Sequence, residues 1–154
     1  MIVMTTAKGV ANFNLQVLPT LTVMMFVIRY NKPAPSSLCS PSRRMFVTFP
    51  GTKTYFSHLD ISERSPHLLS HGKKIVLAIA EGARDISHLT VTLGPLQTLH
   101  AYKLRIDPSN FKLFSHCLLV TLACHMGEEF TPVAHAAIDK YLSAFSAVLA
   151  EKYR

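Results

Sequence analysis

LQTLHAYKLRIDP, residues Leu96–Pro108, is the stretch of sequence on which the fold depends. It is typical of a short helix that ends after a histidine, followed by a tight corner and the start of a longer helix. Its leucines recur with His100 at intervals of three and four residues, so they share one helical face. A histidine on such a face is more often an ordinary core residue than a ligand, so this stretch alone assigns no function.

A second histidine, His71, lies on a similar apolar face 29 residues upstream, at helical spacing from Leu68, Ile75 and Ile79. Two imidazoles on facing helices, each among leucine and isoleucine, suit a flat apolar cofactor that carries a metal. Neutral imidazole is a common iron ligand, and a proximal histidine is a standard way to hold haem iron. An iron-bound imidazole usually donates its other ring proton to a carbonyl, here expected one helical turn back, near Leu96.

The net charge of +7 raises the question of nucleic-acid binding. Residues 1–44 contain five basic and no acidic side chains, which leaves 11 basic and 9 acidic side chains in residues 45–154. The body of the chain is therefore nearly neutral, which removes most of the electrostatic case for DNA or RNA binding. The three cysteines, Cys39, Cys117 and Cys124, show no paired metal spacing and predict free thiols in a reducing compartment.

The body of the chain is predicted to be all-α, since no convincing strand pattern appears. Helical segments are expected at about 50–56, 66–84, 95–100, 108–126 and from 132 to near the C-terminus, each opened by a proline. Ser65, Asp107 and Thr131 supply the capping residue of the three longest helices. Gly94–Pro95 is expected to start the short helix that bears His100.

Residues 1–43 differ from the rest of the chain. Residues 17–28 are almost continuously apolar, but these twelve residues are fewer than the roughly 20 that span a membrane. They have the length of a signal-peptide core, but no A-x-A-like cleavage site follows. Residues 31–42 contain three prolines and several serines, which predict a linker without a helix. We expect two parts, an atypical apolar segment with a Pro/Ser linker over 1–43 and a helical domain over 44–154.

Several motifs of the helical domain resemble the globin family, most closely the alpha subunits of fish haemoglobins. They are PGTKTYF (50–56), HGKK (71–74), LHAYKLRIDP (99–108), SHCLLVTLA (115–123), EFTP (129–132) and the terminal KYR (152–154). The resemblance covers 111 of the 154 residues and implies a globin fold that lacks its usual first two helices. Leu59 departs from the family where a bulkier aromatic is usual, and Gly51 where a hydroxyl residue is usual.

The resemblance implies haem b as the cofactor. It makes His100 the proximal ligand to iron and His71 the distal residue, which reaches the iron through bound oxygen. Phe56 is expected to stack on the porphyrin, and His58 and Lys74 to lie by its propionates. The remaining expected contacts are Tyr55, Ile75, Leu96, Leu99, Leu104, Ile106, Asn110, Phe111 and Leu149.

The resemblance also implies a reversible oxygen carrier, an alpha-type subunit of a tetrameric haemoglobin in the cytoplasm of the erythrocyte. Its expected partner is a beta-type globin chain, with no nucleic-acid or membrane partner. The positions that match contacts with a beta chain are Arg44, Phe49, His116, Val120, Phe130, Pro132, His135 and Asp139. Those that match the surfaces sensitive to quaternary state are Tyr55, Asp107, Asn110, Tyr153 and Arg154.

Two other functions are considered. A globin-fold peroxidase or nitric-oxide dioxygenase is disfavoured because the sequence adds no positioned acid or base, so no enzyme is expected. The alternative to an oxygen carrier is an aberrant or truncated globin product that cannot close its haem pocket. Without the first two helices, apolar side chains such as Leu68, Ile79 and Phe114 are expected to lose cover, and each buried one is worth about 1.5–3 kcal/mol.

Overall fold

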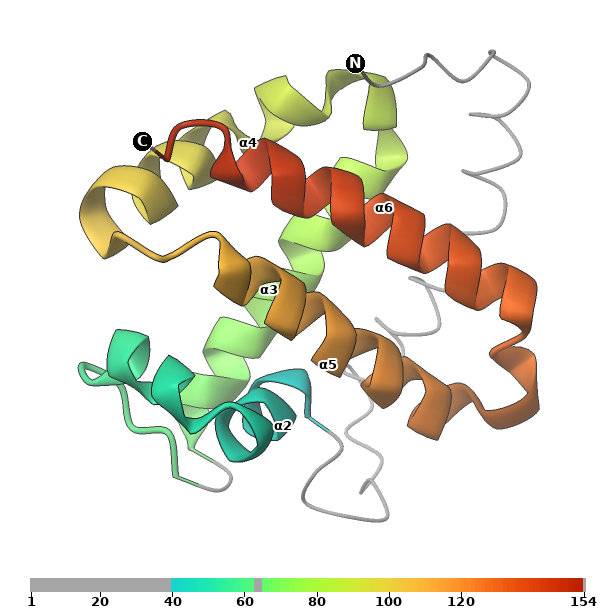
Figure 1. The fold of residues 1–154 in the computed structure, drawn as a ribbon, viewed down its shortest axis with the longest axis horizontal. Coiled ribbons are helices and arrows are strands. Elements are labelled where there is room, and N and C mark those ends of the chain that lie inside the picture. The colour runs from blue at the N-terminus through green and yellow to red at the C-terminus, as the bar shows by residue number, and fades with distance from the viewer. Residues whose placement is uncertain (1–39, 63–64, 154) are drawn as a thin grey trace.

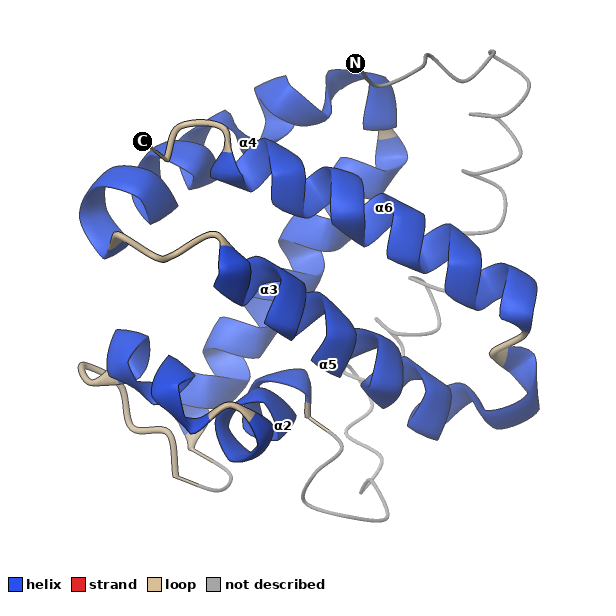
Figure 2. Ribbon diagram, viewed as in Figure 1, coloured by secondary structure: helices blue, strands red, loops and turns tan. Residues whose placement is uncertain are grey.

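The computed structural model describes residues 40–62 and 65–153, and within them every regular element is helical, as Figure 2 shows. The α-helices are α2 (Pro41–Thr48), α3 (Pro66–Arg84), α4 (Leu89–Thr98), α5 (Ser109–Met126) and α6 (Pro132–Ala150). Shorter helical segments are η1 (Pro50–Phe56), η2 (Ile86–His88), η3 (Leu99–Leu104) and η4 (Gly127–Glu129). The all-α prediction is confirmed for this part of the chain. The apolar segment 17–28 and most of the predicted linker lie outside the described residues.

Two of the three predicted capping residues cap their helices. The Ser65 hydroxyl accepts a hydrogen bond from the Leu68 N–H at 3.5 Å, and the Thr131 hydroxyl accepts one from Ala134 at 3.2 Å. Each cap satisfies an N–H that the first helical turn leaves without a partner. At α5 the N-cap is Pro108, which makes no side-chain cap, and the Asp107 carboxylate accepts the N–H of Ser109 at 2.8 Å from one residue earlier.

Two predicted boundaries are wrong. The helix before His100 begins at Leu89, and Pro95 lies inside it rather than at its start. Leu89 and Leu93 are buried in the main core, so packing of the first turn outweighs the Gly-Pro start signal. At the other boundary, Pro41 and Ser42 were assigned to a linker but begin α2. Proline at the first helical position leaves no intrahelical bond unmade, which explains why the helix starts there.

Figure 1 shows α5 and α6 side by side at the front, with α3 crossing behind them. The main hydrophobic core lies between these helices and α4, and its least exposed members include Ile79, Leu93, Leu118 and Ile138. A smaller cluster of Met45, Phe46 and Cys117 joins α2 to α5, with Phe56 and Leu68 packed against it. The helices thus enclose the core from several sides and leave His71 and His100 near its edge.

At Gly82, α3 comes close to side chains of α4 and α6. The Tyr141 hydroxyl donates a hydrogen bond of 2.6 Å to the Ile79 carbonyl, and burial raises the pKa of that phenol. A Cβ atom at Gly82 would lie 2.7 Å from Leu89 Cδ1 and 2.8 Å from the Tyr141 hydroxyl. Glycine is therefore required for α3 to reach α4 and α6 at this distance.

No helix in residues 40–62 and 65–153 has both the length and the hydrophobicity that crossing a membrane requires. In the same part of the chain, Cys117 and Cys124 are free thiols, and burial raises the pKa of Cys117.

We predict that Gly82→Ala lowers the free energy of unfolding by about 1–3 kcal/mol, because the new methyl group overpacks the α3–α6 crossing. The matched control is Gly72→Ala on the same helix, where a Cβ would meet nothing within 4 Å. That change should be neutral or stabilising by about 0.5–1 kcal/mol, since it only removes backbone freedom. Urea unfolding of the two variants beside the wild type measures both effects. Equal destabilisation by the two substitutions would contradict the proposed crowding.

Candidate functional site

His100 lies in η3, which is a turn of π-helix directly after α4. Its Nδ1 is 2.7 Å from the Leu96 carbonyl oxygen, as expected from the sequence. A carbonyl only accepts, so Nδ1 carries the proton and Nε2 keeps a free lone pair. The half-buried imidazole is thus held in the tautomer that can bind a metal through Nε2.

The corner after His100 is closed by its own carbonyl group. The N–H groups of Arg105 and Ile106 both point to the His100 carbonyl oxygen, the second at 3.2 Å. Arg105 adopts a left-handed backbone conformation, with φ of 49°, which costs a non-glycine residue roughly 1–2 kcal/mol. The tight corner predicted after His100 is therefore confirmed. Strained residues and π-turns are concentrated at functional sites, so the geometry of this corner favours a site at His100.

His71 lies on α3 with a buried Nδ1 atom that has no hydrogen-bond partner among the described residues. Its ring meets the Phe56 ring edge to face, with centroids 5.3 Å apart. Burial is the main cause that holds the pKa of His71 below its ordinary 6.5, and electrostatic interactions with His100, Lys74 and His58 lower it further. The imidazole is therefore neutral near pH 7 and has an unused polar atom, which an ordinary core histidine would not leave unpaired.

Aromatic rings extend from both histidines. Phe46 packs edge to face on Phe56 with centroids 4.9 Å apart, so a row of rings runs from α2 through η1 to His71. On the other side, His100 meets the Phe111 ring of α5 at 5.5 Å. The two imidazoles thus stand in separate apolar settings and are close enough for the charge of one to affect the other.

The other predicted site residues vary in exposure. Ile75, Leu96, Ile106 and Phe111 are half-buried, Leu149 is buried, and His58 and Lys74 are exposed. Leu99 and Leu104 are 37% and 38% exposed although both are apolar. The Asp107 N–H donates to the Tyr55 hydroxyl at 3.3 Å, and the Asn110 amide donates to the Asp107 carbonyl at 3.0 Å. Tyr55, Asp107 and Asn110 thus connect η1 to the start of α5.

The sequence pattern did not single out Gln97. This side chain is 2% exposed and hydrogen-bonded to the end of α6, 51 and 54 residues away in the chain. The signal that the sequence offered for Gln97 was its position as an amide side chain in a largely apolar helix.

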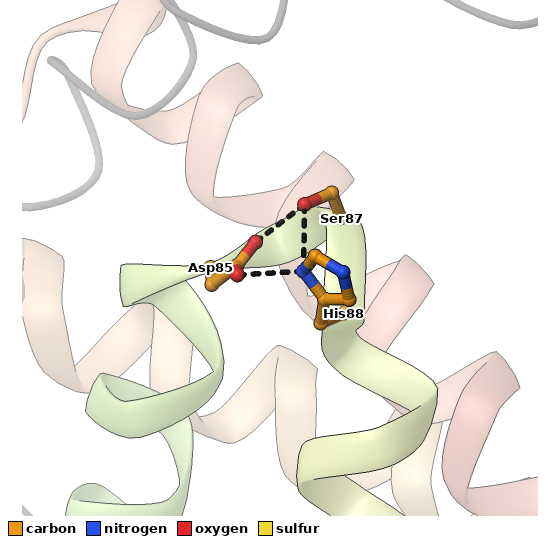
Figure 3. A network of polar contacts seen from close by, with 3 residues as sticks. All are labelled: Asp85, Ser87 and His88. Atoms are coloured by element: carbon orange, nitrogen blue, oxygen red, sulfur yellow. Dashed lines mark hydrogen bonds and ion pairs between the residues drawn. The ribbon is translucent and has the colours of Figure 1, made fainter.

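Asp85, Ser87 and His88 form a polar network between α3 and α4, shown in Figure 3. The Ser87 hydroxyl is the main cause of a lowered pKa at Asp85, and the network is exposed. Both the serine and the aspartate lie on Nδ1 of His88, whereas a hydrolytic triad uses the two ring nitrogens separately. The geometry therefore favours a structural corner. Nowhere in the described residues do three or more His, Cys, Asp or Glu side chains lie together as a possible metal-binding group.

Some of the residues expected to meet a partner chain lie close together. His116 and Val120 are one helical turn apart on α5, and Cys124, which was not among the expected contacts, is one turn further on. The Arg44 guanidinium is 3.7 Å from the Cys124 sulfur. The rings of Phe130 and His135 are 5.6 Å apart. Of the expected pair at the chain end, Tyr153 is exposed, and Arg154 lies outside the described residues.

Comparison with known proteins gives consistent matches. The globin family model matches residues 43–149. The chain is 55% identical over 111 residues to haemoglobin subunit alpha-D of Branta canadensis, which covers 72% of this chain and 79% of that protein. Haemoglobin subunit alpha-D of Anser indicus is 53% identical over 112 residues, covering 73% and 79%. The same subunit of Meleagris gallopavo is 53% identical over 111 residues, covering 72% and 79%.

We predict that the His71 imidazole makes stability pH-dependent in the folded chain before any cofactor is added. Below about pH 6.5 the unfolded chain takes up a proton on this imidazole, while the folded chain does not until its lower pKa is reached. The unfolded state therefore binds more protons, and the stability present above pH 6.5 is lost as the pH falls. Urea unfolding at pH 7.5 and 5.5 should show the wild type losing more stability than His71→Gln. A difference between the two proteins that stays constant with pH would contradict this.

Proposed function

The chain belongs to the globin family, and on that basis we propose that it is a non-enzymatic, alpha-type haemoglobin subunit that binds haem b and carries oxygen reversibly. The observation that carries this proposal is the hydrogen bond between His100 Nδ1 and the Leu96 carbonyl. It leaves Nε2 as a potential metal-binding atom on an apolar helix face, where one histidine would suffice because a porphyrin would supply its own nitrogen ligands to the iron.

Three further features of this chain fit haem. His71 has a buried ring nitrogen with no hydrogen-bond partner in the described part of the chain, and the imidazole is neutral near pH 7. Phe56 and Phe111 place aromatic rings beside the two histidines. Leu99 and Leu104 expose apolar surface that an apolar ligand would cover, at about 25 cal/mol for each Å² removed from water. When bound, haem supplies an iron atom at which oxygen binds reversibly.

Each histidine has a distinct role in this proposal. His100 is the proximal ligand, and the Leu96 carbonyl fixes its ring orientation and tautomer. His71 is the distal residue: as a neutral imidazole it donates one hydrogen bond to a polar ligand without adding a charge to the pocket. The apolar groups proposed to exclude water are Phe56, Ile75, Leu96, Leu99, Leu104, Ile106, Phe111 and Leu149. Tyr55 and Asn110 complete the proposed contacts, and exposed His58 and Lys74 suit the propionates.

We assign the globin domain to residues 44–154 and leave residues 1–43 as a separate segment. The match to the family model begins at residue 43, and the first described helix begins at Pro41. Of the three side chains expected to lose cover without the family's first two helices, Ile79 is 2% exposed, whereas Leu68 and Phe114 are half-buried. Haem uptake by the chain is the observation that separates an oxygen carrier from a product that cannot close its pocket.

The proposed partner is a beta-type globin chain, and the proposed location is the erythrocyte cytoplasm. Relatives named as haemoglobin subunits support the proposed partner. The contact of Arg44 with Cys124 also supports it, because it places Arg44 beside the helix α5 that carries His116 and Val120. The proposed interface is completed by Phe49, Phe130, Pro132, His135 and Asp139.

We predict that the purified chain, given haem, shows an absorption spectrum that changes reversibly with oxygen. His100→Gly should abolish the spectrum of histidine-ligated ferrous haem, and added imidazole should partly restore it by filling the vacated ligand position. His125→Gly is the control, since its Nδ1 also bonds a backbone carbonyl, at Thr121, outside the proposed pocket. An unchanged ligand-free spectrum in His100→Gly would refute the assignment. A wild-type chain that takes up no haem would favour the aberrant product.

We predict that mixing with a beta-type globin chain gives a larger species in sedimentation velocity, while the chain alone stays mostly monomeric. Val120→Glu should prevent assembly, because it places a charge at the centre of the proposed interface. The exposed Val91 of α4 lies outside that interface, so Val91→Glu should assemble normally. Assembly that is unaffected by Val120→Glu would show that the chain uses another surface.

A further inference from the structure

Gln97 links α4 to the end of α6 through a buried amide. Its Nε2 donates one hydrogen bond to the Val148 carbonyl at 2.7 Å and another to Glu151 Oε2 at 3.1 Å. Both amide protons are used, so the side chain has one orientation that satisfies its donors. A leucine would fill the same apolar volume without this directional requirement, and an unpaired buried amide is costly.

A second contact lies beside the first. The Lys152 ammonium donates to the Thr98 hydroxyl at 3.1 Å, and Thr98 donates in turn to the Gly94 carbonyl at 3.2 Å. Leu93 and Leu149 belong to the same core cluster, so the end of α6 is packed on α4 as well as bonded to it. The last turn of α6 and the residues after it therefore hold the end of α4 at two successive positions.

This linked end of α4 is the part that orients His100. Leu96, whose carbonyl holds the His100 Nδ1, directly precedes Gln97, and the π-turn with His100 begins one residue after Thr98. A shift of Gln97 must move the Leu96 carbonyl with it, because the two share a peptide bond. The direction of the His100 ring depends on that carbonyl.

We propose that Gln97 is a positioning residue, which couples the C-terminal end of α6 to the orientation of the His100 imidazole. The inference rests on the proposed ligation of haem by His100.

The first test needs no cofactor. Hydrogen exchange of the Arg105 and Ile106 amides, which both bond the His100 carbonyl, reports the order of this corner. Gln97→Leu should speed their exchange about tenfold, as expected from the loss of one or two net hydrogen bonds. The control is Ser115→Ala, which removes a hydroxyl contact of 3.3 Å between α5 and α6 and leaves α4 untouched. Equal effects of the two variants would overturn the proposal.

The second test uses an exposed residue, so that loss of folding does not obscure the result. Glu151→Ala removes the acceptor at the far end of the link, whereas Glu151→Gln keeps an acceptor oxygen for the Gln97 amide. In the haem-loaded ferrous protein, Glu151→Ala should shift or broaden the iron–histidine stretching band in resonance Raman spectra. Glu151→Gln should match the wild type.

The two tests separate this proposal from the proposed function. A band that is identical in Glu151→Ala and the wild type would show that His100 is oriented without Gln97, although haem is bound. A chain that takes up no haem would refute the function, while the exchange rates of Arg105 and Ile106 would still decide the coupling.

Discussion

The hydrogen bond from His100 Nδ1 to the Leu96 carbonyl is the interaction on which the candidate site depends. It selects the tautomer, fixes the ring direction and leaves Nε2 as the only ring atom able to accept a metal. The surrounding structure supports this bond from two directions. The N–H groups of Arg105 and Ile106 close the corner onto the His100 carbonyl, and the end of α6 holds the helix that carries Leu96. The corner at Arg105 and Ile106 and the end of α6 thus both support the hydrogen bond between His100 and Leu96, although these two segments are far apart in the chain.

The two site histidines show how one residue type acquires two roles from its surroundings. His100 has its Nδ1 proton engaged by a carbonyl, so its remaining nitrogen has a free lone pair that suits the proposed role of ligand. His71 has a buried Nδ1 with no partner among the described residues, and burial together with nearby positive charge keeps it neutral. A protonated imidazole at this position would lose its lone pair and add a charge to an apolar pocket. These surroundings suit His100 to the proposed role of metal ligand and His71 to the proposed role of hydrogen-bond donor.

The sequence predicted those parts of the fold that local chemistry determines. Ser65 and Thr131 cap their helices as expected, since a hydroxyl followed by proline is a strong start signal. His71 and His100 were singled out because both lie on apolar helix faces, and their roles stay a prediction. Pro95 and Pro41 were misplaced because the same residue can begin a helix, sit within one or follow a linker. For Pro95, tertiary packing decided the outcome, because the burial of Leu89 and Leu93 extends α4 to residues before the proline. Gln97 was missed because its partners, Val148 and Glu151, are remote in sequence.

The largest gap between pattern and structure lies in η3. A spacing of three and four residues assumes α-helical geometry, and it placed Leu104 on the same face as His100. In the structure the backbone widens into a π-turn from Leu99 to Leu104, and both leucines are more than one-third exposed. A π-turn inserts an extra residue into the helical repeat, so side chains after it no longer follow the predicted face. The left-handed conformation of Arg105 then ends the turn at an energetic cost. Residues that set the direction of His100 thus depart from regular geometry, and hydrophobic periodicity cannot register that departure, because it records only the regular part of a helix.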